Sequence, residues 1–159
     1  MKVTGKVFAV TGGGSGIGRE VVLELLRRGA RVAAIDLRQG GLDGTRERAG
    51  ASAARLTTHT VDVTDVTAVA ALPDAIIAAH GAVDGLLNVA GIIQKFVPFT
   101  ELEVSDIERV LSVNFWGVVT MTRAFLPHLL RRPEAALVNV SSMGAFIPVP
   151  GQTAYGASK

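Results

Sequence analysis

Cysteine is absent from the 159 residues, which excludes disulfide bridges, a thiolate nucleophile and cysteine-based zinc sites. Histidine is scarce: no two of His59, His80 and His128 have the spacing of metal ligands on one helical turn, so we expect no metal site. The sequence also lacks an apolar run long enough to span a membrane, and its first residues lack the apolar stretch of a signal peptide. We therefore expect a cytoplasmic protein with no membrane partner.

An excess of charge is lacking as well, because 16 basic residues face 14 acidic ones and leave a net charge of +2. The arginine pairs at 27–28 and 131–132 fall at predicted helix C-termini, where cations complement the helix dipole. We interpret them as solvated helix ends and expect no nucleic-acid partner. With 48% apolar residues, the composition predicts one globular domain over residues 1–159.

Short, continuously apolar runs alternate with amphipathic stretches along the chain. Continuous apolar runs are typical of parallel strands that are covered on both faces. The predicted strands are Val7–Thr11, Arg31–Asp36, His59–Asp62, Gly85–Asn88 and Ala136–Ser141. The alternation predicts an α/β fold, a doubly wound parallel sheet of Rossmann type with strand order 3-2-1-4-5.

Helices are predicted between the strands, over Gly16–Arg28, over Asp65–Ala79 and in a long stretch that starts at Ser105. Thr64 is the expected N-cap of the second helix, and Ser105 with Glu108 forms a capping box for the third. The stretch Gln39–Ala54 is rich in glycine and charge and predicts only a short helix within a loop.

Glycine is abundant, and its densest cluster is Thr11–Gly18, between the first predicted strand and the first predicted helix. Glycines there let the backbone approach a pyrophosphate closely, and the helix N-terminus supplies free N–H groups. Asp36 ends the second predicted strand, at the spacing where a carboxylate accepts hydrogen bonds from an adenosine ribose. Alone, Asp36 would fit a strand-end turn equally well. Together with the glycine cluster, it predicts a dinucleotide site.

At this point the chain resembles the short-chain dehydrogenase/reductase family over its whole length. The family's Asn-Asn-Ala-Gly motif is matched with one departure, Val89. The matching elements are, in order, Thr11–Gly18 (Thr-Gly-x-x-x-Gly-x-Gly), Asp62-Val63, Asn88–Gly91, Asn114 within Leu111–Asn114, Asn139–Ser142 and Tyr155–Lys159 (Tyr-x-x-x-Lys).

The resemblance implies a dinucleotide cofactor, and Asp36 favours NAD(H) because its charge would repel the 2′-phosphate of NADP(H). Ser15 adds no cation where NADP-binding relatives often carry one, whereas Arg38 is a nearby cation that could turn towards a phosphate. The expected cofactor-binding residues are Gly12, Ser15, Gly16, Ile17, Gly18, Asp36, Leu37, Asp62, Val63, Asn88, Ala90, Gly91, Tyr155 and Lys159.

By the same resemblance, the catalytic residues are Asn114, Ser142, Tyr155 and Lys159. Tyr155 would handle the proton at the substrate oxygen, with the charge of Lys159 one helical turn away. The family's serine precedes its tyrosine by thirteen positions, which selects Ser142 and leaves Ser141 as a turn cap. Asn114 would hold a water that passes protons to Lys159; a buried structural asparagine is the alternative.

The implied function is an NAD(P)-dependent oxidoreductase that transfers a hydride between NAD(H) and an alcohol or ketone. The segments after the fourth and fifth predicted strands, Ile92–Phe96 and Met143–Pro148, should flank the substrate, and their apolar character favours an uncharged small molecule. The aromatic residues Phe115, Trp116 and Phe125 are expected to pack in the core rather than to contact ligands.

Family members usually continue well past the position of Lys159. The resemblance therefore implies a C-terminally incomplete fold that ends at the catalytic lysine, lacks the substrate lid, and belongs to a homo-oligomer when complete. One alternative is a non-catalytic NAD-binding module, which would not need Tyr155 and Lys159. The other is an inactive truncated fragment, in which we expect the segment from about Gly144 onward to be poorly fixed.

Overall fold

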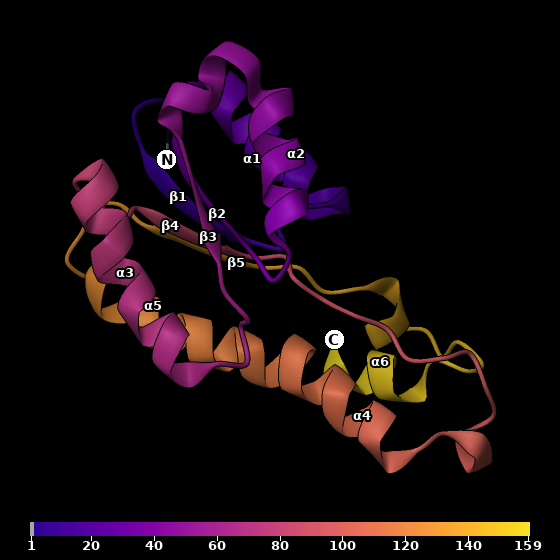
Figure 1. Cartoon of the computed structure of the whole chain (residues 1–159). Helices are drawn as coiled ribbons and strands as arrows, with labels where there is room; N and C mark the ends of the chain where they lie inside the picture. Colours follow the sequence, from indigo (N-terminus) through magenta and orange to yellow (C-terminus); the bar gives the residue numbers. More distant parts are fainter. Residues whose placement is uncertain (1) are drawn as a thin grey trace.

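The computed structural model describes residues 2–159 and has a five-stranded sheet at its centre (Figure 1). The strands pair in the order β3-β2-β1-β4-β5, and every pairing is parallel. They are β1 (Val7–Thr11), β2 (Arg31–Asp36), β3 (Leu56–Thr60), β4 (Gly85–Asn88) and β5 (Ala136–Asn139). The predicted Rossmann-type sheet and its strand order are thereby confirmed.

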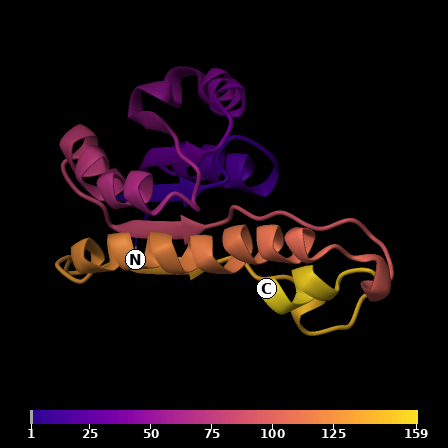
Figure 2. The ribbon, with the colours of Figure 1, turned by 60° about the horizontal axis from the view of Figure 1, so that its bottom comes forward.

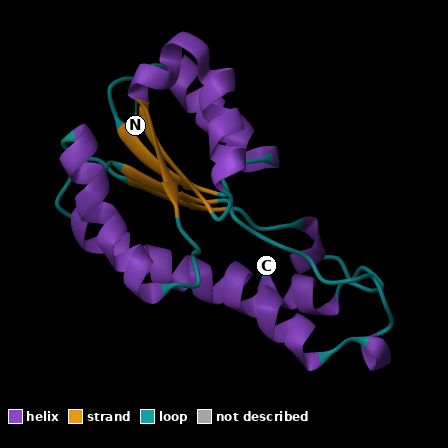
Figure 3. Ribbon diagram, viewed as in Figure 1, coloured by secondary structure: helices purple, strands orange, loops and turns teal. Residues whose placement is uncertain are grey.

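Helices cover both faces of the sheet, as Figure 3 shows. On one face lie α1 (Gly16–Arg27) and α2 (Gln39–Ala49), and on the other lie α3 (Val66–His80) and α5 (Val118–Leu129). The remaining helices, α4 (Val104–Leu111) and α6 (Thr153–Ser158), lie beyond the carboxyl ends of the strands. None of the helices in residues 2–159 is both long and apolar enough to cross a bilayer.

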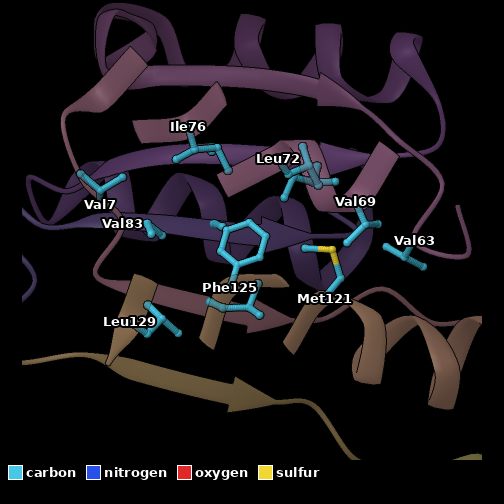
Figure 4. Packing of buried hydrophobic residues seen from close by; sticks show 13 residues of the cluster. Val7, Val63, Val69, Leu72, Ile76, Val83, Met121, Phe125 and Leu129 are labelled. Carbon is cyan, nitrogen blue, oxygen red and sulfur yellow. The ribbon is translucent and has the colours of Figure 1, made fainter. Parts of the chain in front are cut away.

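Alternation along β1 divides the core into two clusters, because successive strand residues point to opposite faces. Phe8 and Val10 pack under α1 and α2, whereas Val7 and Ala9 pack against α3 and α5. Figure 4 shows the second cluster, in which the fully buried ring of Phe125 lies between the sheet and α3. Both faces of the sheet are therefore anchored, which fixes the ends of the strands where the site lies.

Several element boundaries differ from the predicted ones: β3 and β5 each end two residues earlier, at Thr60 and Asn139. Strand β3 starts at Leu56, three residues earlier than expected, because the β-branched pair Thr57–Thr58 joins the ladder with β2. The stretch predicted as a short helix in a loop instead forms α2, an 11-residue helix, followed by 3₁₀ turns over Gly50–Arg55 (η1). Leu42 is fully buried from α2, and this tertiary packing outweighs the poor helix propensity of the glycines.

The predicted helix caps are also corrected. Helix α3 is capped by Asp65, whose carboxylate accepts hydrogen bonds from the N–H groups of Thr67 and Ala68, and not by Thr64. Helix α4 starts earlier than expected, and its N-cap is Glu103 rather than Ser105.

Two of the three aromatic residues expected in the core are exposed. Phe125 is buried, but Phe115 and Trp116 are 48% and 60% exposed and contact each other edge to face. The cause is a π-helical turn over Ser112–Gly117 (η3), which widens the helix and turns Asn114 inward in place of the aromatic pair.

The segment from Gly144 onward is described through Lys159, contrary to the expectation that it would be poorly fixed. It contains the turn Met143–Ala145 (η4) and α6, which packs on α4. Ser158 of α6 is bonded to Asn114, and the Ser141 hydroxyl donates to the Lys159 carbonyl at 2.9 Å. Hydrogen bonds to the body of the fold thus hold a helix too short to be stable alone.

Asp84 is a buried carboxylate that joins three parts of the chain at the amino edge of the sheet. It accepts from the Val7 N–H at 2.9 Å and from Arg132 Nε at 2.8 Å, and Lys6 Nζ lies 3.8 Å away. Asp84→Ala should lower the free energy of unfolding by about 2–3 kcal/mol, because bonds to a charged acceptor are lost. Chemical denaturation measures this loss. The exposed Asp74→Ala serves as control, and equal effects of the two substitutions would contradict the assignment.

His59 and His80 share the Thr57 hydroxyl, at 3.0 and 2.9 Å from their Nε2 atoms. Burial lowers the pKa of both imidazoles below 6.5, and the charges of Arg31 and His59 lower the pKa of His80 further. Because the folded-state pKa lies below the ordinary value of 6.5, the unfolded chain binds protons before the folded chain does as the pH falls. The two histidines therefore contribute fully to the free energy of unfolding above pH 6.5, and this contribution is lost as the pH falls. Urea unfolding across this range should show the loss, and His80→Gln should reduce it. An unchanged pH dependence in the variant would contradict this role.

Candidate dinucleotide and catalytic site

A cavity of about 730 Å³ lies at the carboxyl edge of the sheet, bordered by the glycine loop, the segments that follow β2, β3 and β4, and the junction of α4 with η3. Eleven of the expected cofactor-binding residues line it, namely Gly12, Ser15, Gly16, Ile17, Gly18, Asp36, Leu37, Asp62, Val63, Ala90 and Gly91. Within residues 2–159, no group of three or more histidine or carboxylate side chains could hold a metal ion.

The glycine loop, Gly12–Gly18, packs closely against its neighbours, and side chains would not fit at four of its glycines, Gly12, Gly13, Gly14 and Gly18. Gly12 has a φ of +71°, and a Cβ there would lie 3.0 Å from the backbone of Ala90. A Cβ on Gly18 would lie 2.1 Å from the Gly12 carbonyl oxygen. The loop therefore forms a bare backbone surface at the N-terminus of α1, the arrangement that accommodates a pyrophosphate.

The buried Thr11 hydroxyl ties the glycine loop to the segment after β4. Its oxygen accepts hydrogen bonds from the N–H groups of Val89 and Ala90, at 3.0 and 3.1 Å. The backbone of the segment Asn88–Gly91 is thereby bonded to the end of β1. These bonds fix the glycine loop and the segment after β4, which both line the cavity, relative to each other.

Arg19 and Thr45 brace the glycine loop from α1 and α2, a role that the sequence did not reveal. The guanidinium of Arg19 donates to the carbonyls of Gly14 and Gly41, and its Nε donates to Thr45 Oγ1 at 3.0 Å. Thr45 in turn donates to the Gly13 carbonyl at 2.8 Å. Arg19 directly follows the glycine motif, whereas Thr45 lies in α2, a helix that the sequence predicted to be shorter. No pattern in the residues around Arg19 or Thr45 indicates that the two side chains pair.

Asp36 is held in a fixed orientation beside the loop. One carboxylate oxygen accepts from the Gly14 N–H at 2.9 Å, and the other accepts from the Arg38 N–H at 3.0 Å. A Cβ on Gly14 would lie 2.8 Å from the Asp36 Cγ, so glycine is needed for this approach. A carboxylate has about four acceptor positions, and each oxygen of Asp36 keeps one for a ligand hydroxyl.

Asp62 and Val63 line the cavity beyond Asp36. The Asp62 carboxylate accepts from the N–H and the hydroxyl of Thr64, at 2.9 and 2.8 Å. Val63 packs on η3, where a Cβ added to Gly117 would lie 2.8 Å from its methyl group. Both residues were expected to bind the cofactor, and both line the cavity.

Asn88 turns away from the cavity. Its side-chain nitrogen donates to Asn139 Oδ1 at 2.9 Å and contacts the Thr122 hydroxyl at 3.4 Å, so it joins β4 to β5 and α5. Among the described residues, its Oδ1 is the one buried side-chain polar atom without a hydrogen-bond partner. These contacts give the Asn88 side chain a structural role, and Asn88, which was expected to bind the cofactor, is not among the residues that line the cavity.

The Asn114 side chain is fully engaged. Its Oδ1 accepts from the Ile92 N–H at 2.8 Å, and its Nδ2 donates to the Ile92 carbonyl and to Ser158 Oγ, both at 2.9 Å. Both amide hydrogens are thereby used. This geometry favours the structural alternative for the side chain, which joins η3 to the loop after β4 and to α6.

The turn after β5 is capped by Ser142 and not by Ser141. Ser142 caps η4, because its Oγ accepts from the Gly144 N–H at 3.1 Å, and Ser141 instead bonds to Lys159. The expectation that Ser141 caps the turn was therefore wrong. As an acceptor in the cap, the Ser142 hydroxyl keeps its own hydrogen free for a ligand oxygen.

Tyr155 lies on α6 and Lys159 directly follows this helix, one turn later; neither of them, nor Ser142 or Asn114, is among the residues that line the cavity. The ring of Tyr155 is half-buried beside Gly144, next to the Ser142 cap. Lys159 Nζ donates to the Val140 carbonyl at 3.1 Å and would lie 3.0 Å from a Cβ on Gly91. Since Gly91 lines the cavity, the lysine ammonium reaches its wall.

Residues 6–159 match the sequence profile of the family described as short chain dehydrogenase. The chain belongs to this family. It is 43% identical over 155 residues to a putative oxidoreductase, SadH, from Mycobacterium tuberculosis, covering 98% of this chain and 56% of SadH. The chain thus spans little more than half the length of curated relatives such as SadH.

Solved structures agree with the family assignment. NAD⁺-bound xylitol dehydrogenase superposes with a TM-score of 0.95 at 30% identity, over 100% of this chain and 61% of the other. A metagenomic short-chain oxidoreductase in complex with NADP superposes with a TM-score of 0.91 at 29% identity, over 100% of this chain and 72% of the other. Structural neighbours of this chain therefore include both NAD and NADP complexes.

Proposed function

We propose that this chain is the dinucleotide-binding and catalytic part of an NAD-dependent oxidoreductase that interconverts alcohols and ketones. One observation carries the proposal: the cavity lined by Asp36 and the glycine loop is also lined by Gly91, and the Lys159 ammonium lies close against Gly91. The cavity therefore joins groups suited to hold a dinucleotide with groups suited to move a proton.

The residues present fit a dinucleotide. Gly12 and Gly18 let the loop fold tightly, because a Cβ on either would collide with protein backbone, and the pyrophosphate would lie on the cavity side of this loop at the N-terminus of α1. Asp36 keeps one acceptor position on each oxygen for the ribose hydroxyls, and Asp62 and Val63 border the space next to it, suited to the adenine. These fits support cofactor roles for the residues of the cavity wall.

In the proposed chemistry, each of four residues in or near α6 has one task. Bound nicotinamide supplies the hydride for ketone reduction. Ser142 donates a hydrogen bond to the substrate oxygen, and Tyr155 donates the proton that this oxygen takes up as the C–O bond becomes an alcohol. The ammonium of Lys159 stabilises the phenolate that remains. Asn114 positions α6 through Ser158.

The cofactor is NAD(H) rather than NADP(H), because a 2′-phosphate would meet the Asp36 carboxylate at close range. The guanidinium of Arg38, which follows in the cavity lining, is the one opposing feature. The substrate is an uncharged small alcohol or ketone. Support comes from the exposed apolar side chains after β4 and β5, Ile93, Phe96, Met143, Phe146 and Ile147.

Isotope transfer tests the proposed reaction. The full-length protein that carries this chain is incubated with NADH deuterated at the nicotinamide C4 and with a panel of uncharged ketones, and the products are analysed by mass spectrometry. Deuterium on the carbinol carbon is the expected result. A complete lack of transfer to any ketone, by a folded protein that binds NADH, would contradict the catalytic assignment.

A further inference from the structure

Gln94 is a buried polar side chain that the proposed chemistry does not use. It lies in the segment after β4 and is only 2% exposed. Its Oε1 accepts from the Tyr155 N–H at 3.0 Å, and its Nε2 donates to the Gly151 carbonyl at 2.7 Å. One glutamine therefore bonds the backbone at two points of the segment that leads into and begins α6.

Helix α6 needs this support at its N-terminus. It has only six residues, and its N-cap, Gln152, makes no side-chain capping bond. The first N–H groups of a helix have no partner within the helix, and a helix this short is unstable alone. Gln94 supplies the missing acceptor from a different part of the chain, at the residue that carries the proposed proton donor.

The backbones of the two segments are in close contact here. Gly151 has a φ of +77°, and a Cβ on it would lie 3.3 Å from the Phe96 Cα. Figure 2 shows the segment after β4 running out beyond the sheet, towards the end of the molecule where α6 lies. Asn114 bonds the C-terminal end of α6 through Ser158, and Gln94 bonds its N-terminal end. Tyr155 lies between the two attachments.

We propose that Gln94 is a positioning residue for Tyr155, an inference that rests on the proposed function of Tyr155 in proton transfer. Gln94 fixes the position and orientation of the first turn of α6. It thereby fixes the place of the Tyr155 phenol relative to Ser142 and to the bound nicotinamide. It acts through the backbone and touches none of the reacting atoms.

The test compares Gln94→Met with Gln39→Met in the full-length protein. Methionine matches the length of glutamine but cannot make either bond, and Gln39 is an exposed glutamine outside the cavity lining. Gln94→Met should lower kcat for ketone reduction by about tenfold to a hundredfold with unchanged NADH affinity. It should also shift the pH profile of kcat. Gln39→Met should change neither.

A conservative variant and a non-kinetic readout complete the test. Gln94→Glu keeps the acceptor for the Tyr155 N–H but loses the donor to the Gly151 carbonyl, so it should restore part of the lost turnover. Hydrogen exchange at the Tyr155 amide should be slow in the wild type and in Gln94→Glu but fast in Gln94→Met. Should Gln94→Met fail to fold, the comparison of Gln94→Glu with the wild type carries the test through exchange and kcat.

The outcomes separate this inference from the proposed function. Wild-type kcat in Gln94→Met, alongside an inactive Tyr155→Phe, would overturn the positioning role alone. A parallel loss of NADH affinity would also overturn it, since that result indicates a general structural role. Full activity in Tyr155→Phe would refute the proposed function instead, and unchanged amide exchange in Gln94→Met would then refute the positioning as well.

Discussion

Tyr155→Phe is expected to lower kcat for NADH-dependent ketone reduction by about a thousandfold, within the range for loss of a general acid. The change removes one hydroxyl from a half-buried ring and leaves the backbone bond to Gln94 in place. Affinity for NADH should be unchanged, because the glycine loop and Asp36 line the cavity and Tyr155 does not. Steady-state kinetics and a calorimetric NADH titration measure the two quantities.

The pattern of the two measurements is as informative as their size. Loss of turnover together with loss of NADH binding would mean that Tyr155 acts through the structure of α6 rather than through its proton. Retention of turnover would remove Tyr155 from the reaction altogether. Tyr155 is the only tyrosine in the 159 residues, so no other phenol in this part of the protein could replace it.

The second large effect concerns cofactor choice. Asp36→Ser should shift the ratio of NADH to NADPH affinity towards NADPH by about a hundredfold, corresponding to roughly 2.7 kcal/mol. The substitution removes a charge that repels the 2′-phosphate and an acceptor for the ribose hydroxyls. Arg38, two residues later in the cavity lining, remains as a cation that can attract the phosphate. Parallel titrations with the two cofactors measure the shift.

Asp43→Ser is the matched control, because Asp43 is an exposed aspartate on α2 outside the cavity lining. Its cofactor ratio should equal that of the wild type. Asp36 also accepts a hydrogen bond from the Gly14 N–H, so thermal unfolding of both variants measures how much stability the loss of this bond costs. An unchanged ratio in a folded Asp36→Ser variant would show that the carboxylate does not govern the choice of cofactor.

The features that the sequence predicts correctly are those that depend on residues close together in the chain. The run Val7–Thr11, the glycines after it and the helix at Gly16 form one continuous unit, and repetition of such units dictates a parallel sheet. The strand order and the walls of the cavity follow. By contrast, β3 and the cap of α4 were misplaced, because short polar and apolar runs leave such boundaries undefined.

The features that sequence reasoning missed depend on distant pairs. Gln94 and Tyr155 are 61 positions apart, and Arg19 meets Thr45 across 26. Nothing in the residues around Gln94 indicates that its amide is buried against another loop. The outward turn of Phe115 and Trp116 has a different cause, since a π-helical turn shifts the inward face of the helix without any change in the apolar pattern.

The most direct test of the central claim is to map NADH onto the protein by nuclear magnetic resonance. In an isotope-labelled sample, added NADH should shift the backbone amides of the glycine loop, of Asp36 and Leu37, of Asp62–Thr64 and of Ala90–Gly91, because these residues line the cavity. Amides around Asp74 and Asp84, far from that edge, should stay in place. Shifts confined to other surfaces, or no shifts at saturating NADH, would contradict the claim that this cavity is a dinucleotide site.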